Sequence, residues 1–347
     1  MAPKLATIDA SEPLDRILDA ISRDGGVIVS NFLEPGLLEE SIRAIEPFFS
    51  SGKLYDPKSS HKDLGDDFFP EGSQRAYVRT SSHAGYDPSA SKTNTRCLQG
   101  LLAKMPEQIT KIIRLSVWQG VMAHFLNGEF VGFNGANKTT RKSGYILSST
   151  AAIRLVPGAE RQALHRDDVN YGTGNLHDPK NPLFTPMVGC LIAGSRATYK
   201  NGATAVIPGS HLWGPDRAPK VEECTYAEME PGSALFTLGI TKACELATDT
   251  PLLFVVTYHG GGMNQCERTD PDAVRTLFAI FGQRDFYRQD QQEILSTPIE
   301  IARSLPDDIL RLTGYYKAVG GVGFIGDHQD PAEFLHVDTN GVGKFNN

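Results

Sequence analysis

Three features are missing from this sequence of 347 residues, and each absence argues against a class of protein. The five cysteines are scattered, without a C-x-x-C pair, which argues against a disulfide framework or a zinc knuckle. Lys and Arg form no cluster and the formal net charge is -7, which argues against a nucleic-acid partner. No window approaches the roughly 18 uncharged apolar residues of a membrane-spanning helix, and the N-terminus shows no apolar signal segment. We therefore expect a cytoplasmic globular protein with no nucleic-acid or membrane partner.

The first half of the chain combines helical and irregular patterns. Residues 12–25 and 34–49 have apolar side chains at helical spacing, and the β-rich stretch 26–32 lies between them. Residues 51–92 are rich in Ser, Gly, Asp and Lys, which is typical of a loop. Residues 98–126 show helical periodicity with a break at Pro106, and so predict one or two helices.

From Ser148 onward the pattern changes to short β-rich runs separated by Gly, Pro and Asn. These runs are 150–158, 187–194, 203–210, 233–240, 252–261 and 276–282. Such spacing is typical of an antiparallel sandwich or barrel. With no linker in view, we expect one domain over residues 1–347. Its parts would be a helical N-terminal part (about 1–147), a β core (about 148–290), and a C-terminal helix with a tail (about 291–347).

The segment RQALHRDDVNYG, residues 161–172, is a candidate metal site. On a strand, residues two apart point to the same face, so His165 and Asp167 share a face while Arg166 points away. One carboxylate and two imidazoles form the facial triad that holds Fe(II) and leaves positions open for co-substrate and dioxygen. An H-x-D pair is common by chance, however. For the motif taken alone, a strand-end histidine beside an aspartate that caps a turn is the more common explanation.

Further motifs together resemble the phytanoyl-CoA dioxygenase (PhyH) family, most closely its fungal branch that modifies terpenoids and alkaloids. They are QALHRDD, NGATAVIPGSHLWGP, MEPGSALFTLG, YHGGGMN and VRTLFAIFGQRDFYRQDQQEIL. The resemblance extends to LTGYYKAVGGVGFIGDHQDP and covers nearly the whole chain. It implies a mainly β fold with flanking helices on a double-stranded β-helix, a jelly-roll of the cupin-like kind. It also implies an Fe(II)- and 2-oxoglutarate-dependent dioxygenase, with O2 as the other co-substrate, that forms a homodimer.

Carried onto this sequence, the resemblance implies that iron is bound by the catalytic residues His165, Asp167 and His259. His211, in the PGSH stretch, is the alternative third ligand, although a histidine there more often braces a loop.

The co-substrate 2-oxoglutarate has a distal carboxylate that suits a guanidinium able to make two parallel bonds. Arg275 is the candidate because it follows the distal histidine and begins the apolar run TLFAIFG. Arg268 is the alternative, but it lies in the polar stretch ERTDPD. Gln162 and Thr204 match family positions that hydrogen-bond the co-substrate, and on sequence alone each is more often structural.

The resemblance implies hydroxylation, desaturation or rearrangement of a terpenoid or alkaloid intermediate in fungal secondary metabolism. The alternatives are a catalytically silent jelly-roll subunit that partners an active homologue, and an acyl-CoA hydroxylase, which the acidic pI of about 5.7 disfavours. Candidate residues lining the substrate pocket are Phe68, Phe69, Tyr77, Ile146, Leu147, Ile153 and Trp213.

One segment departs from the family pattern. Relatives have only a few residues between the ALFTLGI and YHGGGMN motifs, where this chain has TKACELATDTPLLFVVT, residues 241–257. Either LLFVV supplies the strand that delivers His259, or the segment is foreign to the fold, as a translated intron would be. In the second case its removal should improve both stability and iron binding.

Overall fold

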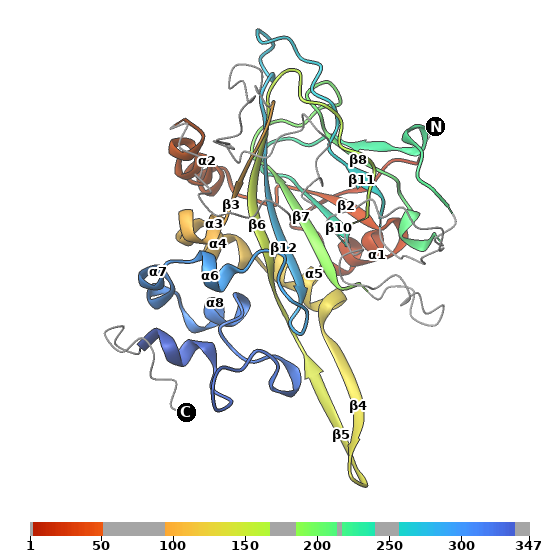
Figure 1. Cartoon of the computed structure of the whole chain (residues 1–347). Helices are drawn as coiled ribbons and strands as arrows, with labels where there is room; N and C mark the ends of the chain where they lie inside the picture. Colours follow the sequence, from red (N-terminus) through yellow and green to blue (C-terminus); the bar gives the residue numbers. More distant parts are fainter. Residues whose placement is uncertain (1–2, 51–93, 167–184, 214–216, 240–256, 337–347) are drawn as a thin grey trace, which may run out of the picture.

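The computed structural model describes residues 3–50, 94–166, 185–213, 217–239 and 257–336, and its centre is a pair of β-sheets (Figure 1). The larger sheet has the strand order β1-β2-β10-β7-β12-β6-β3, and the smaller has the order β11-β8-β9. The large-sheet strands are β1 Thr7–Asp9, β2 Gly26–Ser30, β3 Thr95–Gln99, β6 Tyr145–Leu155, β7 Met187–Ala193, β10 Ala234–Leu238 and β12 Arg275–Arg284. The small-sheet strands are β8 Thr204–Val206, β9 Thr225–Ala227 and β11 His259–Gly260.

The strand order identifies the core as a jelly-roll. A backbone bridge between His165 and His259 places the segment at His165 beside β11, so the small sheet continues as β9-β8-β11 and then this segment. The central strands of the large sheet run β10-β7-β12-β6. Successive segments from β6 to β12 therefore fill two facing sheets in the order of a double Greek key. The expected fold class, mainly β with flanking helices on a double-stranded β-helix, is confirmed.

Helices cover the outer side of the large sheet (Figure 1). They are α1 Leu14–Asp24, α2 Pro35–Ser50, α3 Leu101–Lys104, α4 Pro106–Ile113, α5 Ser116–Leu126, α6 Glu293–Ser296, α7 Ile299–Ser304 and α8 Asp307–Leu312. Short 3-10 turns are η3 Ser210–Leu212, η4 Val221–Glu223, η5 Val319–Gly321 and η6 Pro331–His336. None of the helices in the described ranges is long and apolar enough to cross a membrane.

The N-terminal predictions hold in part. The expected helix, strand and helix correspond to α1, β2 and α2, and α1 ends where Gly25 takes a left-handed conformation with φ 77°. The part of the chain expected to be helical also contributes β1, β2 and β3 to the large sheet. Residues 98–126 form three helices where one or two were expected. The expected loop at 51–92 lies outside the described residues.

A two-stranded hairpin was not predicted from the sequence. β4 (Gly128–Asn134) pairs antiparallel with β5 (Asn137–Ser143), and in Figure 1 this hairpin projects away from the sheets. Its strands carry Gly, Asn and many charged side chains, which are depleted in strands, so their β signal is weak.

The two faces of the large sheet pack in two different apolar clusters. One lies under the helices and contains side chains such as Ile17, Trp118 and Phe278. The other joins large-sheet residues such as Leu277 to Val206 of the small sheet, and so marks the space between the two sheets. Residues of β12 and β8 can therefore be assigned to an inner or outer face by alternation.

Most of the atypical segment, residues 240–256, lies outside the described residues, but the chain on either side of it is described. The Thr257 N–H donates to the Leu238 carbonyl at 3.3 Å, so the chain before the segment and the chain after it lie side by side. Thr257 is also anchored independently, because its hydroxyl donates to the Gly25 carbonyl at 2.8 Å.

We predict that a chain lacking residues 240–256 folds, because Leu238 and Thr257 already lie within hydrogen-bond distance of each other, and Gly239 and Thr257 each keep a separate anchor, on Met187 and Gly25. Its melting temperature should lie no more than about 4 °C below that of the unaltered protein, which corresponds to about 1 kcal/mol or less. Thermal unfolding of the deletion variant, and of one with two glycines at the junction, tests this. A large loss of stability in both would show that the segment contributes a strand to the sheet.

Candidate active site

The side chains of His165 and His259 lie together on neighbouring segments of the small sheet. The His165 N–H donates to the His259 carbonyl at 2.9 Å, and the His259 N–H donates back to the His165 carbonyl at 3.1 Å. Directly opposed residues of an antiparallel pair project to the same face. Accordingly the two ring centroids are 4.7 Å apart, and both side chains are buried. The fold thus brings two of the three expected iron ligands together from distant parts of the sequence.

This pair of imidazoles faces the space between the sheets. His259 lies opposite Val206 in the pairing of β11 with β8. Val206 packs in the apolar cluster between the sheets, whereas its neighbours Ala205 and Ile207 belong to a cluster on the outer face. Because opposed residues share a face, the imidazoles of His259 and His165 lie on the inner face with Val206.

Backbone carbonyls fix the tautomer of both rings. Nδ1 of His165 lies 2.7 Å from the carbonyl oxygen of Ala163, and Nδ1 of His259 lies 3.2 Å from that of Thr257. A carbonyl oxygen can only accept, so in each contact Nδ1–H is the donor and Nε2 carries the lone pair. Hydrogen bonds of this kind orient histidines that bind metals through the other nitrogen.

The third expected ligand, Asp167, lies outside the described residues, directly after Arg166. Within the described ranges no three His, Cys, Asp or Glu side chains form a group that could hold a metal. The role of the Asp167 carboxylate as the third iron ligand therefore stays a prediction.

His211, the alternative third ligand, is held by a different part of the fold. It is fully buried, its Nε2 lies 3.0 Å from the Ser22 carbonyl at the end of α1, and its ring contacts Gly25. Burial lowers the pKa of this imidazole. These contacts join η3 to the α1–β2 turn, which is a bracing arrangement.

Arg275 is a buried cation on the inner face of the large sheet. It alternates with Leu277, which packs in the cluster between the sheets, so both side chains point inward. Arg275 is 2% exposed, and the Nε and Nη1 of its guanidinium make no hydrogen bond with a described residue. Burial lowers the pKa of Arg275 to about 9, so the group is charged at neutral pH. Arg268, the alternative, is exposed.

Thr204 lies near the same end of the inter-sheet space as Arg275. It alternates with the inward-facing Val206 on β8 and is buried. Leu155 is opposite Arg275 in the β6–β12 pairing, and its Cδ1 lies 2.9 Å from where a Cβ on Gly202 would stand. Gly202 is two residues before Thr204, so the start of β8 lies beside the Arg275 end of the large sheet.

Gln162 pairs with Gly261 because its segment contains one extra residue relative to the register of the histidine pair. If the register of the histidine pair continued, Ala163 would pair with Gly261. Instead the Gln162 N–H donates to the Gly261 carbonyl at 2.9 Å, and its Oε1 accepts from the Gly261 N–H at 3.1 Å. The extra residue is a β-bulge, a feature that redirects side chains near active sites. Gln162 therefore has a structural role, because its backbone and its side chain both bind Gly261.

Two of the residues expected to line the substrate pocket, Leu147 and Trp213, do not face the space between the sheets. Alternation from Ile153 would put Leu147 on the inner face, but the register of β6 shifts by one residue near Ser149, and Leu147 packs under the helices. Trp213 packs against Tyr258 on the outer face of the small sheet. Ile153 does pack toward the inter-sheet cluster. Phe68, Phe69 and Tyr77 lie outside the described residues.

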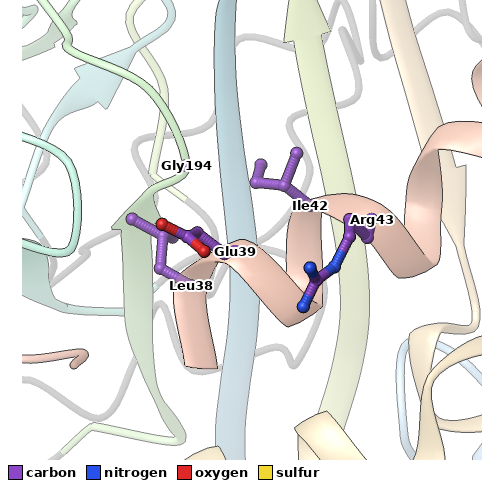
Figure 2. Close-up of a pocket in the computed structure, with 5 residues that line it drawn as sticks. All are labelled: Leu38, Glu39, Ile42, Arg43 and Gly194. Carbon is purple, nitrogen blue, oxygen red and sulfur yellow. The ribbon is translucent and has the colours of Figure 1, made fainter. Parts of the chain in front are cut away.

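Two pockets on the described surface contain none of the residues expected to bind iron or 2-oxoglutarate. One of about 310 Å³ lies between α2 and the end of β7, on the helix side of the large sheet (Figure 2). It is lined by Leu38, Glu39, Ile42, Arg43 and Gly194. A second of about 470 Å³ lies on the outer face of the small sheet, beside Ile207 and Trp213.

Sequence reasoning missed a contact that holds the two histidine-bearing segments together from behind. Arg166 and Tyr258 are the next residues along from the histidine pair and lie opposite each other, with the guanidinium carbon 4.2 Å from the ring centroid. Arg166 Nη2 also donates to the carbonyls of Ser210 and Trp213, at 2.8 and 3.2 Å. The Tyr258 N–H donates to the Ser210 hydroxyl. The signal was available, since alternation predicts that Arg166 points away from the metal.

We predict that Arg166→Met lowers the free energy of unfolding by about 1.5–3 kcal/mol, because buried carbonyls lose a charged donor. Arg161→Met is the matched control, since this half-buried arginine in the same segment donates to the Tyr226 hydroxyl. Its effect should be smaller. Denaturant titration measures both, and equal losses would contradict a special role for Arg166.

Comparisons with known proteins identify a family for this chain. The family model described as phytanoyl-CoA dioxygenase (PhyH) matches residues 21–241. The chain is 30% identical to Dioxygenase swnH1 of Arthroderma benhamiae, over 95% of this chain and 92% of the relative. It is 25% identical to Dioxygenase peniF of Penicillium patulum, over 93% of this chain and 88% of that protein.

Among solved structures, the chain is similar to the non-heme alpha ketoglutarate dependent carbocyclase SnoK from nogalamycin biosynthesis. The TM-score is 0.49 at 14% identity, over 83% of this chain and 91% of that one.

Proposed function

Since the chain belongs to the phytanoyl-CoA dioxygenase family, we propose that it is an Fe(II)- and 2-oxoglutarate-dependent dioxygenase. Its proposed substrate is a terpenoid or alkaloid intermediate of fungal secondary metabolism, and we further propose that it is a cytoplasmic homodimer. One observation carries the chemistry. The inner faces of the two sheets hold a pair of imidazoles with fixed tautomers and a buried guanidinium whose Nε and Nη1 have no described partner.

The proposed iron ligands are His165, Asp167 and His259. Two imidazoles and one carboxylate are the donor set that suits non-haem Fe(II). The Nδ1 contacts to Ala163 and Thr257 support this assignment, because they leave Nε2 of each ring as the donor atom toward the inner face. The carboxylate of Asp167 is expected on the same face, two residues after His165.

The proposed site for 2-oxoglutarate is the Arg275 end of the inter-sheet space. A buried guanidinium without an anion is costly, and a carboxylate that accepts two parallel bonds from it removes that cost. Thr204, at the start of β8 near this end, would offer a hydroxyl. Gln162, held against Gly261, would offer its amide nitrogen.

When bound, the iron with 2-oxoglutarate and O2 supplies the oxidant for an unactivated C–H bond. The chain's own contribution is to position the reacting groups and to exclude water. The paired backbones fix the two imidazoles, and inner-face side chains such as Leu277 and Ala279, each 2% exposed, form a dry wall beside them.

The histidine assignment predicts that His259→Ala weakens Fe(II) binding by more than about 100-fold, since a two-ligand site is easily stripped by buffer. His211→Ala is the control, because it should lower stability through lost packing at α1 yet keep the metal. Anaerobic Fe(II) titration measures both. Iron kept in His259→Ala but lost in His211→Ala would reverse the assignment. Little iron in the unaltered protein would favour the silent-subunit alternative.

The arginine assignment predicts two opposite effects of Arg275→Leu. The affinity for 2-oxoglutarate should fall by roughly 30- to 700-fold, because about 2–4 kcal/mol of charge-assisted bonding is lost. The ligand-free protein should become more stable by about 1–3 kcal/mol, because an unpaired buried charge is removed. Calorimetric binding and denaturant titration measure the two. Arg268→Leu, at an exposed position, should change neither quantity. A loss of 2-oxoglutarate affinity in Arg268→Leu but not in Arg275→Leu would contradict the assignment.

A further inference from the structure

The β4–β5 hairpin exposes large apolar side chains on a segment that extends away from the body. Phe130, Val131 and Phe133 are 42%, 60% and 72% exposed. A two-stranded hairpin is only marginally stable by itself in water. Exposed apolar side chains on such a projection indicate a surface that is covered by a partner.

The two edges of this hairpin differ in charge. β5 carries Lys138, Arg141 and Lys142, and it is the strand that contacts η5. Lysines on an edge strand discourage pairing with another chain. β4 carries one charged residue, Glu129, between apolar residues, and in Figure 1 it lies on the side away from the C-terminal loops. The β4 edge is therefore the one that is open to pairing.

The backbone of β4 presents a regular set of groups along this edge. The loop Gly135–Ala136 joins a closing pair, Asn134 with Asn137, and Gly135 has φ 61°. In a two-residue hairpin the closing pair is hydrogen-bonded, and hydrogen-bonded pairs then alternate along the ladder. The N–H and C=O groups of Glu129, Val131 and Phe133 consequently point outward from the hairpin.

We propose that β4 is a dimerisation edge, where two copies of this chain pair β4 antiparallel to β4 about Val131 and form a four-stranded sheet. This interface rests on the homodimer proposed above. With Val131 at the two-fold axis, Glu129 of each copy pairs with Phe133 of the partner subunit. The outward N–H and C=O groups of all three residues then find partners, and the interface closes upon itself without forming a filament.

The side chains are self-complementary in this register. Phe130 lies opposite Gly132 of the partner subunit, and nothing stands within 4 Å of where a Cβ on Gly132 would be. An aromatic ring placed beside a strand glycine covers the backbone that the glycine exposes. On the other face, Val131 meets Val131 of the partner subunit, with Phe133 on either side. Pairing through β5 would instead bring Lys138 close to Lys142 of the partner subunit, a like-charge contact.

Proline and lysine substitutions on the two edges provide a matched test. Val131 and Thr140 lie opposite each other in the hairpin, and each directs its N–H outward, so proline at either position spares the hairpin's own bonds. Val131→Pro and Val131→Lys should weaken self-association by about tenfold or more, because they remove a central donor or oppose two ammonium groups. Thr140→Pro and Thr140→Lys should leave the dimer intact. Sedimentation velocity at matched concentrations measures all four.

A cysteine pair gives a positive test of the same register. Opposed residues of a hydrogen-bonded pair have Cα atoms about 5.5 Å apart, which suits a disulfide. Val131→Cys should therefore give a covalent dimer when oxidised glutathione accepts the two electrons, whereas Thr140→Cys should not. A monomeric unaltered protein would overturn the homodimer, and a dimer that survives Val131→Pro would overturn only this interface. Anaerobic Fe(II) binding by the Val131 variants should equal that of the unaltered protein, so the outcome is independent of the iron chemistry.

Discussion

The two backbone hydrogen bonds between His165 and His259 are the constraint on which the rest of the site depends. They bring together segments separated by most of the jelly-roll core and set both imidazoles on one face at a ring separation of 4.7 Å. Contacts on the outer face of the small sheet help to hold this register. Arg166 and Tyr258 clamp the outer face, and Ser210 ties that clamp to the end of β8. A one-residue slip would turn one imidazole outward and dismantle the site.

The same space contains a feature that stability alone does not explain. Arg275 is only 2% exposed, and two nitrogens of its guanidinium lack described partners. Such a buried charge opposes folding of the ligand-free chain, yet the large sheet carries it. Charged groups kept at such a cost usually serve a site. An anion that enters beside Arg275 would recover this energy, so the destabilised interior and the affinity for a dicarboxylate have one physical origin.

The sequence predicted those features that depend on local alternation and failed where a register shift intervened. The H-x-D spacing correctly placed Arg166 away from His165, and the apolar run after Arg275 correctly made that arginine an inward residue. Leu147 was misplaced because a bulge in β6 reverses the alternation, and no residue type marks that bulge. The β4–β5 hairpin escaped notice because its strands carry many polar residues and most of its side chains are exposed. The role of Asp167 is still a prediction.

The most direct measurement is an anaerobic crystal structure of the protein with Fe(II) and 2-oxoglutarate, with an anomalous difference map at the iron edge. We expect a single strong peak bonded to Nε2 of His165 and of His259, and the distal carboxylate of the co-substrate paired with Arg275. A peak at His211, or density for 2-oxoglutarate away from Arg275, would contradict the account.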